Sequence, residues 1–140
     1  EVVGSGRLNV LFWDVYDAKL YAPEGKWQGQ RPFALQLSYL REITGKKIAD
    51  KSAEEMRRLG VTSEMKLADW HAQMRRIFPN VDNGDMITGI YTENGDTIFY
   101  FNGEETGRIT EPEFGKVFFD IWLSQETNAP DLRKKLLGLS

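Results

Sequence analysis

The sequence predicts an α+β domain in which helices pack against one side of a largely antiparallel sheet. Patterns typical of strands and helices follow one another in the order β-β-α-α-β-β-β-α-α, without the regular alternation that accompanies a parallel sheet. Two Asn-Gly pairs, at 94–95 and 102–103, are strong signals for β-hairpins, because a type I′ turn needs two residues at positive φ. The length of 140 residues is that of one domain, so we expect a single domain over residues 1–140.

The first predicted strand covers residues 7–21, which are rich in β-branched and aromatic types and contain neither Gly nor Pro. This run fits one long strand, or two strands separated by a bend. Apolar residues occur at both even and odd positions, so both faces of the strand need cover. We therefore expect this strand in the centre of the sheet.

The next strand is expected at residues 33–41, where apolar and polar residues alternate. The apolar positions are Phe33, Leu35, Leu37 and Tyr39. Arg41 continues the same parity, which places a guanidinium group at the end of an apolar stripe.

Two amphipathic helices are predicted in residues 45–60 and 63–78, each with apolar side chains at helical spacing. Gly60 is suited to end the first helix, and Pro79 follows the second. The apolar stripe of the second helix should face the sheet.

A β-meander follows, with strands expected at 86–92, 97–102 and 106–109. The run 110–113 combines a capping box with Pro in the first turn, and it opens a helix with a wide apolar face. A last helix is expected at 130–137.

Composition and charge exclude several classes of protein. The chain is 41% hydrophobic and 28% charged, which is typical of a globular domain, and its net charge is −3. Basic and acidic residues are mixed, so we expect no nucleic acid partner. No run approaches the roughly 20 apolar residues of a membrane-spanning helix. With no Cys and one His, the chain lacks the ligands of the usual zinc sites, and we expect neither a metal nor a cofactor.

The first six residues, EVVGSG, contain neither an initiator Met nor the basic and apolar regions of a signal peptide. We therefore expect that a targeting segment has been removed. The absence of Cys is compatible with folding in an oxidising compartment, where free thiols mispair.

Tyr39 and Arg41 form the most specific candidate site. An arginine on the apolar parity of a half-buried strand must reach solvent or find a counter-charge such as Glu42 or Asp50. The alternative is an anion hook at the end of an apolar cavity, in which Arg41 binds a carboxylate and Tyr39 donates its hydroxyl. Such a hook would suit a fatty acid.

Several blocks of the sequence together resemble the bacterial branch of the chalcone isomerase-like family. The blocks are FWDVYDAKLY at 12–21, LREITG at 40–45, FPNV at 78–81, GD at 84–85, FNG at 101–103 and FDIWLS at 119–124. The resemblance implies an open-faced β-sandwich, in which a large antiparallel sheet carries helices on one face. It also implies a periplasmic or secreted location, because many bacterial members carry a signal peptide.

The plant enzymes of this family close a chalcone into a flavanone. Alignment on the motif at 41–45 places their catalytic tyrosine on Ile48, their lysine on Tyr39 and their asparagine on Glu55. Their threonine falls near Asp17, and their arginine falls on Ser5 or, with a short gap, on Arg7. An isoleucine cannot donate a hydrogen bond to a ketone, so the resemblance implies a chain without the catalytic set.

A second branch of the family binds fatty acids without catalysis, through an arginine and a tyrosine in an apolar cleft. The resemblance therefore favours a non-catalytic binder of a fatty acid or similar apolar carboxylate, with Arg41, Tyr39, Arg7 and Asp17 as candidate ligand-binding residues. Two alternatives stay open: a chalcone isomerase-type lyase, and a structural or interaction domain whose cleft is filled by its own aromatic side chains.

Overall fold

The computed structural model describes residues 1–10 and 12–139, which fold into six strands, four α-helices and one short 3-10 turn. The strands are β1 (Val2–Val10), β2 (Trp13–Tyr21), β3 (Phe33–Tyr39), β4 (Met86–Tyr91), β5 (Thr97–Phe101) and β6 (Glu104–Ile109). The helices are α1 (Gly45–Arg58), α2 (Glu64–Ile77), α3 (Pro112–Leu123) and α4 (Pro130–Leu137), and the 3-10 turn η1 is Pro23–Gly25.

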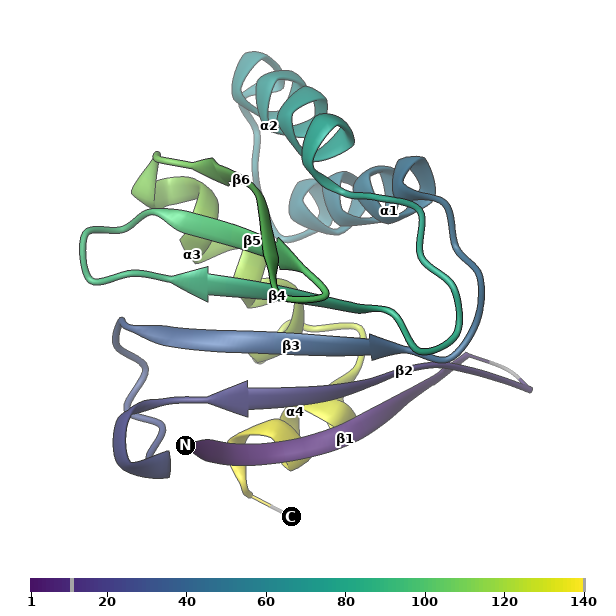
Figure 1. The fold of residues 1–140 in the computed structure, drawn as a ribbon. Coiled ribbons are helices and arrows are strands. Elements are labelled where there is room, and N and C mark those ends of the chain that lie inside the picture. Colours follow the sequence, from purple (N-terminus) through teal and green to yellow (C-terminus); the bar gives the residue numbers. More distant parts are fainter. Residues whose placement is uncertain (11, 140) are drawn as a thin grey trace.

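The six strands form one sheet in which spatial order equals sequence order (Figure 1). Every neighbouring pair is antiparallel, and α1 and α2 are inserted between β3 and β4. The predicted element order and the α+β class are therefore confirmed.

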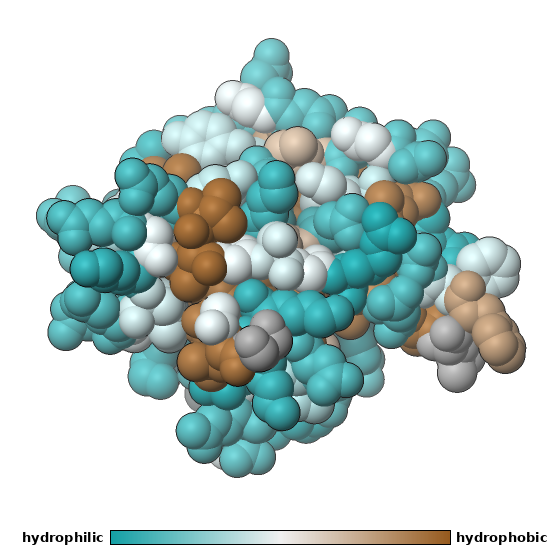
Figure 2. Space-filling model, turned by 90° about the horizontal axis from the view of Figure 1, so that it is seen from below, coloured by the Kyte–Doolittle hydropathy of each residue, from teal (hydrophilic) through white to brown (hydrophobic). Residues whose placement is uncertain are grey.

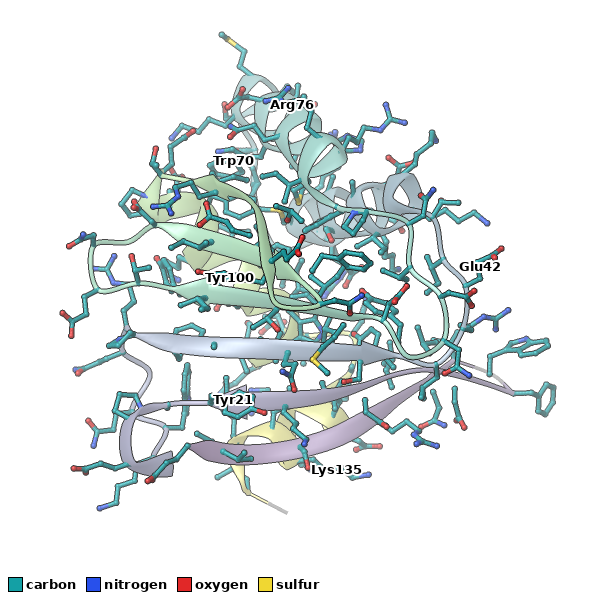
Figure 3. All side chains as sticks on the ribbon, in the orientation of Figure 1. Tyr21, Glu42, Trp70, Arg76, Tyr100 and Lys135 are labelled. Carbon is teal, nitrogen blue, oxygen red and sulfur yellow. The ribbon has the colours of Figure 1, made fainter. Side chains whose placement is uncertain are left out.

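The helices cover one face of the sheet, and the hydrophobic core lies between the two layers. In the view of Figure 1, α3 and α4 lie behind the sheet. The buried strand residues that point toward the helices include Tyr16, Ala18, Leu20, Leu35, Leu37, Tyr39, Ile87 and Phe99. On the opposite face, Tyr21 and Tyr100 are only half-buried (Figure 3). This one-sided cover is the open-faced sandwich that was expected.

Of the two readings of residues 7–21, the single long strand was wrong, and the two strands are present but are joined by a reversal of the chain and not by a bend. β1 and β2 form an antiparallel hairpin in which Val10 pairs with Trp13 and Leu8 pairs with Tyr16. The reversal contains no Gly, Pro or Asn-Gly signal, so the sequence pattern did not reveal it. Leu11, which was expected within the strand, lies outside the described residues.

The central position expected for this run was also wrong for its first half, because β1 is an edge strand of the sheet. The cover that its apolar residues require comes from α4, which packs directly on the β1 backbone. A Cβ atom at Gly4 would lie 2.1 Å from the carbonyl oxygen of Lys135, so only glycine permits this approach.

Strand β3 ends at Tyr39, two residues earlier than expected. The Tyr39 N–H donates to the carbonyl of Asp85 (2.8 Å), and the Leu40 N–H donates to the carbonyl of Val15 (2.9 Å). The chain then leaves the sheet toward α1, so Arg41 does not continue the apolar side of the strand.

Most of the remaining signals agree with the structure, but the capping box predicted at 110–113 is not formed, because Glu111 is the N-cap of α3 and no side chain caps it. Asn102 and Gly103 both have positive φ (50° and 91°), as a type I′ turn requires. At the other Asn-Gly pair only Gly95 has positive φ, so that hairpin uses a different turn. Thr44 and Ser63 cap α1 and α2 by accepting a backbone hydrogen bond. None of the described helices is long and apolar enough to cross a membrane.

Candidate ligand cavity between the sheet and the helices

A cavity of about 570 Å³ lies between the β1–β3 end of the sheet, helices α1 and α3, and the segment that joins α3 to α4. Its apolar lining consists of Leu8, Val10, Val15, Leu37, Ile43, Ile48, Phe78, Ile87, Phe118, Ile121, Trp122 and Ala129. Its polar lining consists of Asn9, Tyr16, Tyr39, Lys47, Lys51, Ser52, Glu55, Thr127 and Asn128. The volume lies within the range of small-molecule sites, roughly 300–1,000 Å³.

The cavity has a buried interior and a solvent-exposed mouth. The interior is formed by Leu37, Tyr39, Phe78, Ile87 and Phe118, all of which are buried. The mouth is formed by the exposed residues Asn9, Val10, Lys47, Lys51 and Asn128. An apolar chain could therefore enter the interior while a charged end group stays at the mouth in contact with water.

Two tyrosines bring hydroxyl groups into this apolar interior. The Trp122 indole N–H donates to the hydroxyl of Tyr16 at 2.7 Å, and the rings of Tyr16 and Tyr39 meet edge to face with centroids 5.6 Å apart. Burial raises the pKa of Tyr16 to about 12 and also raises the pKa of Tyr39. Both tyrosines are therefore neutral at physiological pH. The Tyr39 hydroxyl has no hydrogen-bond partner among the described residues, and it is free to donate to a ligand.

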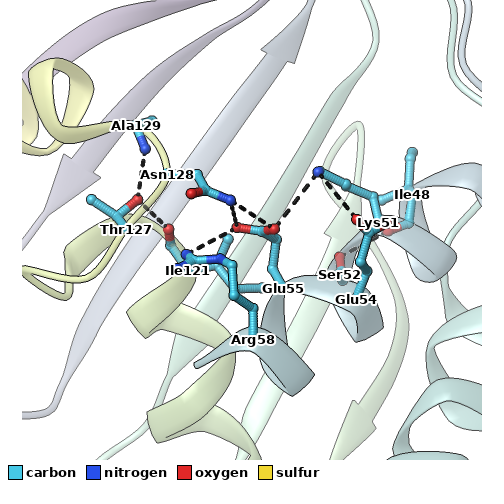
Figure 4. A network of polar contacts seen from close by, with 10 residues as sticks. All are labelled: Ile48, Lys51, Ser52, Glu54, Glu55, Arg58, Ile121, Thr127, Asn128 and Ala129. Atoms are coloured by element: carbon cyan, nitrogen blue, oxygen red, sulfur yellow. Dashed lines mark hydrogen bonds and ion pairs between the residues drawn. The ribbon is translucent and has the colours of Figure 1, made fainter. Parts of the chain in front are cut away.

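A buried carboxylate, Glu55, lies in the wall of the cavity and is only 5% exposed. The Asn128 amide donates to both of its oxygens at 2.9 and 3.0 Å, and Arg58 donates at 3.2 Å (Figure 4). Lys51 adds an ion pair at 3.6 Å. Buried charges require such partners, and this set neutralises Glu55 while it ties α1 to the segment before α4.

Lys47 is the remaining cation of the cavity lining. The structure records no ion pair for its ammonium group within residues 1–10 and 12–139, whereas its neighbour Lys46 pairs with Asp50 at 3.0 Å. Lys47 and Tyr39 flank the connection between β3 and α1. The cavity thus combines an unpaired ammonium group at its mouth with a neutral hydroxyl donor inside.

The structure separates the two residues of the predicted hook. Tyr39 lines the cavity, but Arg41 is not among the described residues that do so. The guanidinium carbon of Arg41 lies 4.4 Å from the ring centroid of Trp13, which is a cation–π contact outside the cavity. The physical reason is the early end of β3, which turns Arg41 away from the apolar side. Neither Glu42 nor Asp50 pairs with Arg41 among the residues the structure describes.

Arg7 and Asp17 face each other across the β1–β2 ladder, on the side of the sheet away from the cavity. The Arg7 Nε donates to an Asp17 carboxylate oxygen at 2.7 Å, and Arg7 also reaches Asp14 at 3.2 Å. This contact lowers the pKa of Asp17. The structure therefore places this pair in a surface ion-pair cluster, and it does not bring the pair together with Tyr39.

The three positions that the family motif aligned with catalytic residues do come together. Ile48, Tyr39 and Glu55 all line the cavity. The positions aligned on the motif therefore lie together in this cavity, and position 48 holds an isoleucine where the plant enzymes have a tyrosine. Sequence reasoning missed Lys47, Tyr16 and Asn128. Lys47 and Glu55 are eight residues apart, a spacing that places both on one face of α1. This spacing could have indicated that Lys47 lies on the same side of the helix as Glu55.

No group of three His, Cys, Asp or Glu side chains that could hold a metal ion occurs in the described part of the chain.

Comparisons with known proteins agree with this architecture. Among solved structures, the crystal structure of the fatty-acid binding protein AtFAP1 from Arabidopsis thaliana is similar, with a TM-score of 0.73 and 11% identity. The match covers 97% of this chain and 85% of that chain, and at this identity it shows the fold alone. No curated protein matches the sequence. A family model described as chalcone isomerase-like matches residues 2–138. The protein therefore belongs to the chalcone isomerase-like family.

Proposed function

We propose that this protein binds a fatty acid or a similar apolar carboxylate without catalysis. The observation that carries the proposal is the open cavity of about 570 Å³, which joins an apolar interior to a mouth that holds a cation. Its volume exceeds the roughly 300 Å³ floor of small-molecule sites, which favours a binding role over a domain with a filled cleft.

The polar groups of the cavity suit one carboxylate at the mouth. Glu55 is already neutralised by Asn128, Arg58 and Lys51, so it does not repel a second carboxylate strongly. Lys47 supplies the unpaired positive charge at the mouth, and the Tyr39 hydroxyl supplies a neutral donor deeper in the cavity, toward which the carboxylate end can point. A charged hydrogen bond is stronger than a neutral one, so Lys47 should contribute more affinity than Tyr39.

The absence of the plant catalytic set supports a non-catalytic role. Ile48 has no donor with which to stabilise a developing oxyanion. Burial also raises the pKa of both cavity tyrosines, which makes them weaker acids. Conversion of a chalcone by the purified protein above the spontaneous rate would contradict this part of the proposal.

The test is calorimetric titration of the protein with palmitate and with hexadecanol, which differ in the carboxylate. Lys47→Met keeps the length of the side chain and removes its charge. It should weaken palmitate binding about tenfold, the low end for a hydrogen bond to a charged group, and change hexadecanol binding less than about twofold.

The matched control is Lys46→Met, which removes the same charge one residue away, on a side chain that pairs with Asp50 and does not line the cavity. It should leave both affinities unchanged. An equal loss of palmitate affinity in the two variants would mean that Lys47 acts only through long-range electrostatic attraction and does not contact the carboxylate. Failure of the wild-type protein to bind either ligand would end the proposal.

A further inference from the structure

Three exposed apolar side chains of the described residues, two of them aromatic, meet at the end of the β1–β2 hairpin. Phe12 is 99% exposed, Trp13 is 59% exposed and Val10 is 50% exposed. We call these three residues the hairpin tip. Figure 1 shows the end of this hairpin extending beyond the rest of the sheet, and in Figure 2 its hydrophobic surface projects from the right edge of the molecule.

Local folding does not require these residues at a chain reversal. Hairpin turns favour Gly, Asn and Asp, and the Asn102-Gly103 turn of this protein follows that rule. A phenylalanine that is almost fully exposed gains no packing energy in the isolated protein. Contiguous exposed apolar residues on a projecting element mark a surface that is buried against something else.

One cation at the hairpin tip, Arg41, is placed to meet an anionic group of an apolar partner. Arg41 lies over the Trp13 ring at 4.4 Å and has no ion pair in the described parts of the chain. The nearby carboxylate of Asp14 is already engaged by Arg7 and Asn9. Tryptophan beside arginine is the pairing found where a protein meets the headgroup region of a bilayer, because both side chains combine an apolar body with a polar end.

The hairpin tip is continuous with the mouth of the cavity. Leu8, Asn9 and Val10 precede the reversal and line the cavity, and Val15 does so on the returning strand. Val10 therefore belongs to both surfaces. Whatever covers the hairpin tip must also lie against the entrance to the cavity.

We propose that the hairpin tip is a membrane-docking element, which inserts Phe12 and Trp13 into the headgroup region of a lipid bilayer and brings the cavity mouth against the membrane surface. A bilayer fits better than a protein groove because it presents acyl chains to the tip, anionic headgroups to Arg41 and an apolar source of ligand to the mouth at once. The proposed membrane docking does not depend on the proposed function, whereas the transfer of a fatty acid through the mouth rests on it.

Flotation with lipid vesicles tests the docking. Wild-type protein should float with phosphatidylcholine vesicles that contain phosphatidylglycerol. Phe12→Ser should weaken this association about tenfold, since it removes one phenylalanine from a partly apolar environment. Arg41→Gln should weaken it about fivefold on the anionic vesicles and little on pure phosphatidylcholine.

The matched control is Met65→Ser, which removes an isolated apolar side chain that is 86% exposed on α2, away from the hairpin tip. It should float like the wild type. Brominated phosphatidylcholine should quench part of the tryptophan fluorescence of the wild type, and this part should be lost in Trp13→Phe.

Three results would overturn the docking: no flotation of the wild type with either vesicle, equal flotation of Phe12→Ser and wild type, or equal losses in Phe12→Ser and Met65→Ser. Self-association in sedimentation that disappears in Phe12→Ser, without flotation of the wild type, would assign the tip to a second copy of this chain instead.

The docking and the proposed function fail separately. Phe12 does not line the cavity, so Phe12→Ser should bind palmitate in solution like the wild type. Flotation without palmitate binding would support membrane docking and contradict the proposed binding of a fatty acid. Palmitate binding without flotation would support the binding of a fatty acid and contradict membrane docking.

Discussion

The two ends of the layer between sheet and helices are built differently. Under β4 to β6 the space is filled by aromatic rings, with centroids 5.7 Å apart for Trp70 and Phe114, 5.4 Å for Phe114 and Phe118, and 5.2 Å for Phe99 and Phe118. Under β1 to β3 the same layer encloses the cavity. The sheet is continuous through both ends, so the backbone architecture alone does not explain the difference.

The volume of the side chains explains why one end of the layer is filled and the other encloses a cavity. At the open end the helix α1 presents Ile48, Ser52 and the neutralised Glu55 to the sheet, and β1 presents Leu8. These side chains are smaller than the rings at the filled end. Rings also line the open end, where Trp122 of α3 donates to Tyr16 of β2, but the smaller side chains of α1 and β1 leave the space beside them unfilled. Phe118 belongs to both ends and forms the wall between core and cavity. One layer thus supplies stability at one end and a binding site at the other.

The largest effect is expected at the filled end, for Trp70→Ala. Trp70 is fully buried, packs edge to face on Phe114 and donates its indole N–H to Glu111 at 3.1 Å. Its removal should lower the free energy of unfolding by about 3–5 kcal/mol, because the surrounding rings cannot close the space. Denaturant unfolding measures this loss. A loss under about 1 kcal/mol would show that the filled end is not closely packed.

A smaller loss is expected when a single methyl group is added at the filled end, in Gly115→Ala. The new Cβ would lie 2.3 Å from a ring carbon of Tyr91 and 2.6 Å from the hydroxyl of Thr97. Helix α3 would have to move away from the sheet, which should cost about 1–3 kcal/mol. Thermal unfolding at one pH compares this variant with the wild type. An unchanged midpoint would mean that the helix layer can shift freely.

The smallest effect on stability is expected for a larger addition at the open end, in Ile48→Phe. The ring can occupy the cavity, so the free energy of unfolding should change by less than about 1 kcal/mol. Palmitate binding should be lost, because the ring takes part of the ligand's volume. Denaturant unfolding and calorimetric titration of the same sample separate the two properties. Normal binding together with normal stability would place the ligand elsewhere.

Much of the fold followed from local patterns. The strand of alternating residues that begins at Phe33, the two capped helices and the meander around Asn102-Gly103 were predicted within a few residues. The reversal between Val10 and Trp13 was missed because its residues favour strands, and only pairing between β1 and β2 reveals it. The end of β3 depends on its contacts with Asp85 and Val15, so the position of Arg41 could not be read from parity.

The sequence by itself determined the family, the element order and the residue types available at 39, 48 and 55, because these depend on neighbours along the chain and on a motif. Only the tertiary structure decided which of those residues meet, that Lys47 rather than Arg41 lines the cavity, and that the cavity is open. The physical reason is that an internal void is set by the summed volumes of side chains from several distant segments. No local pattern records that sum.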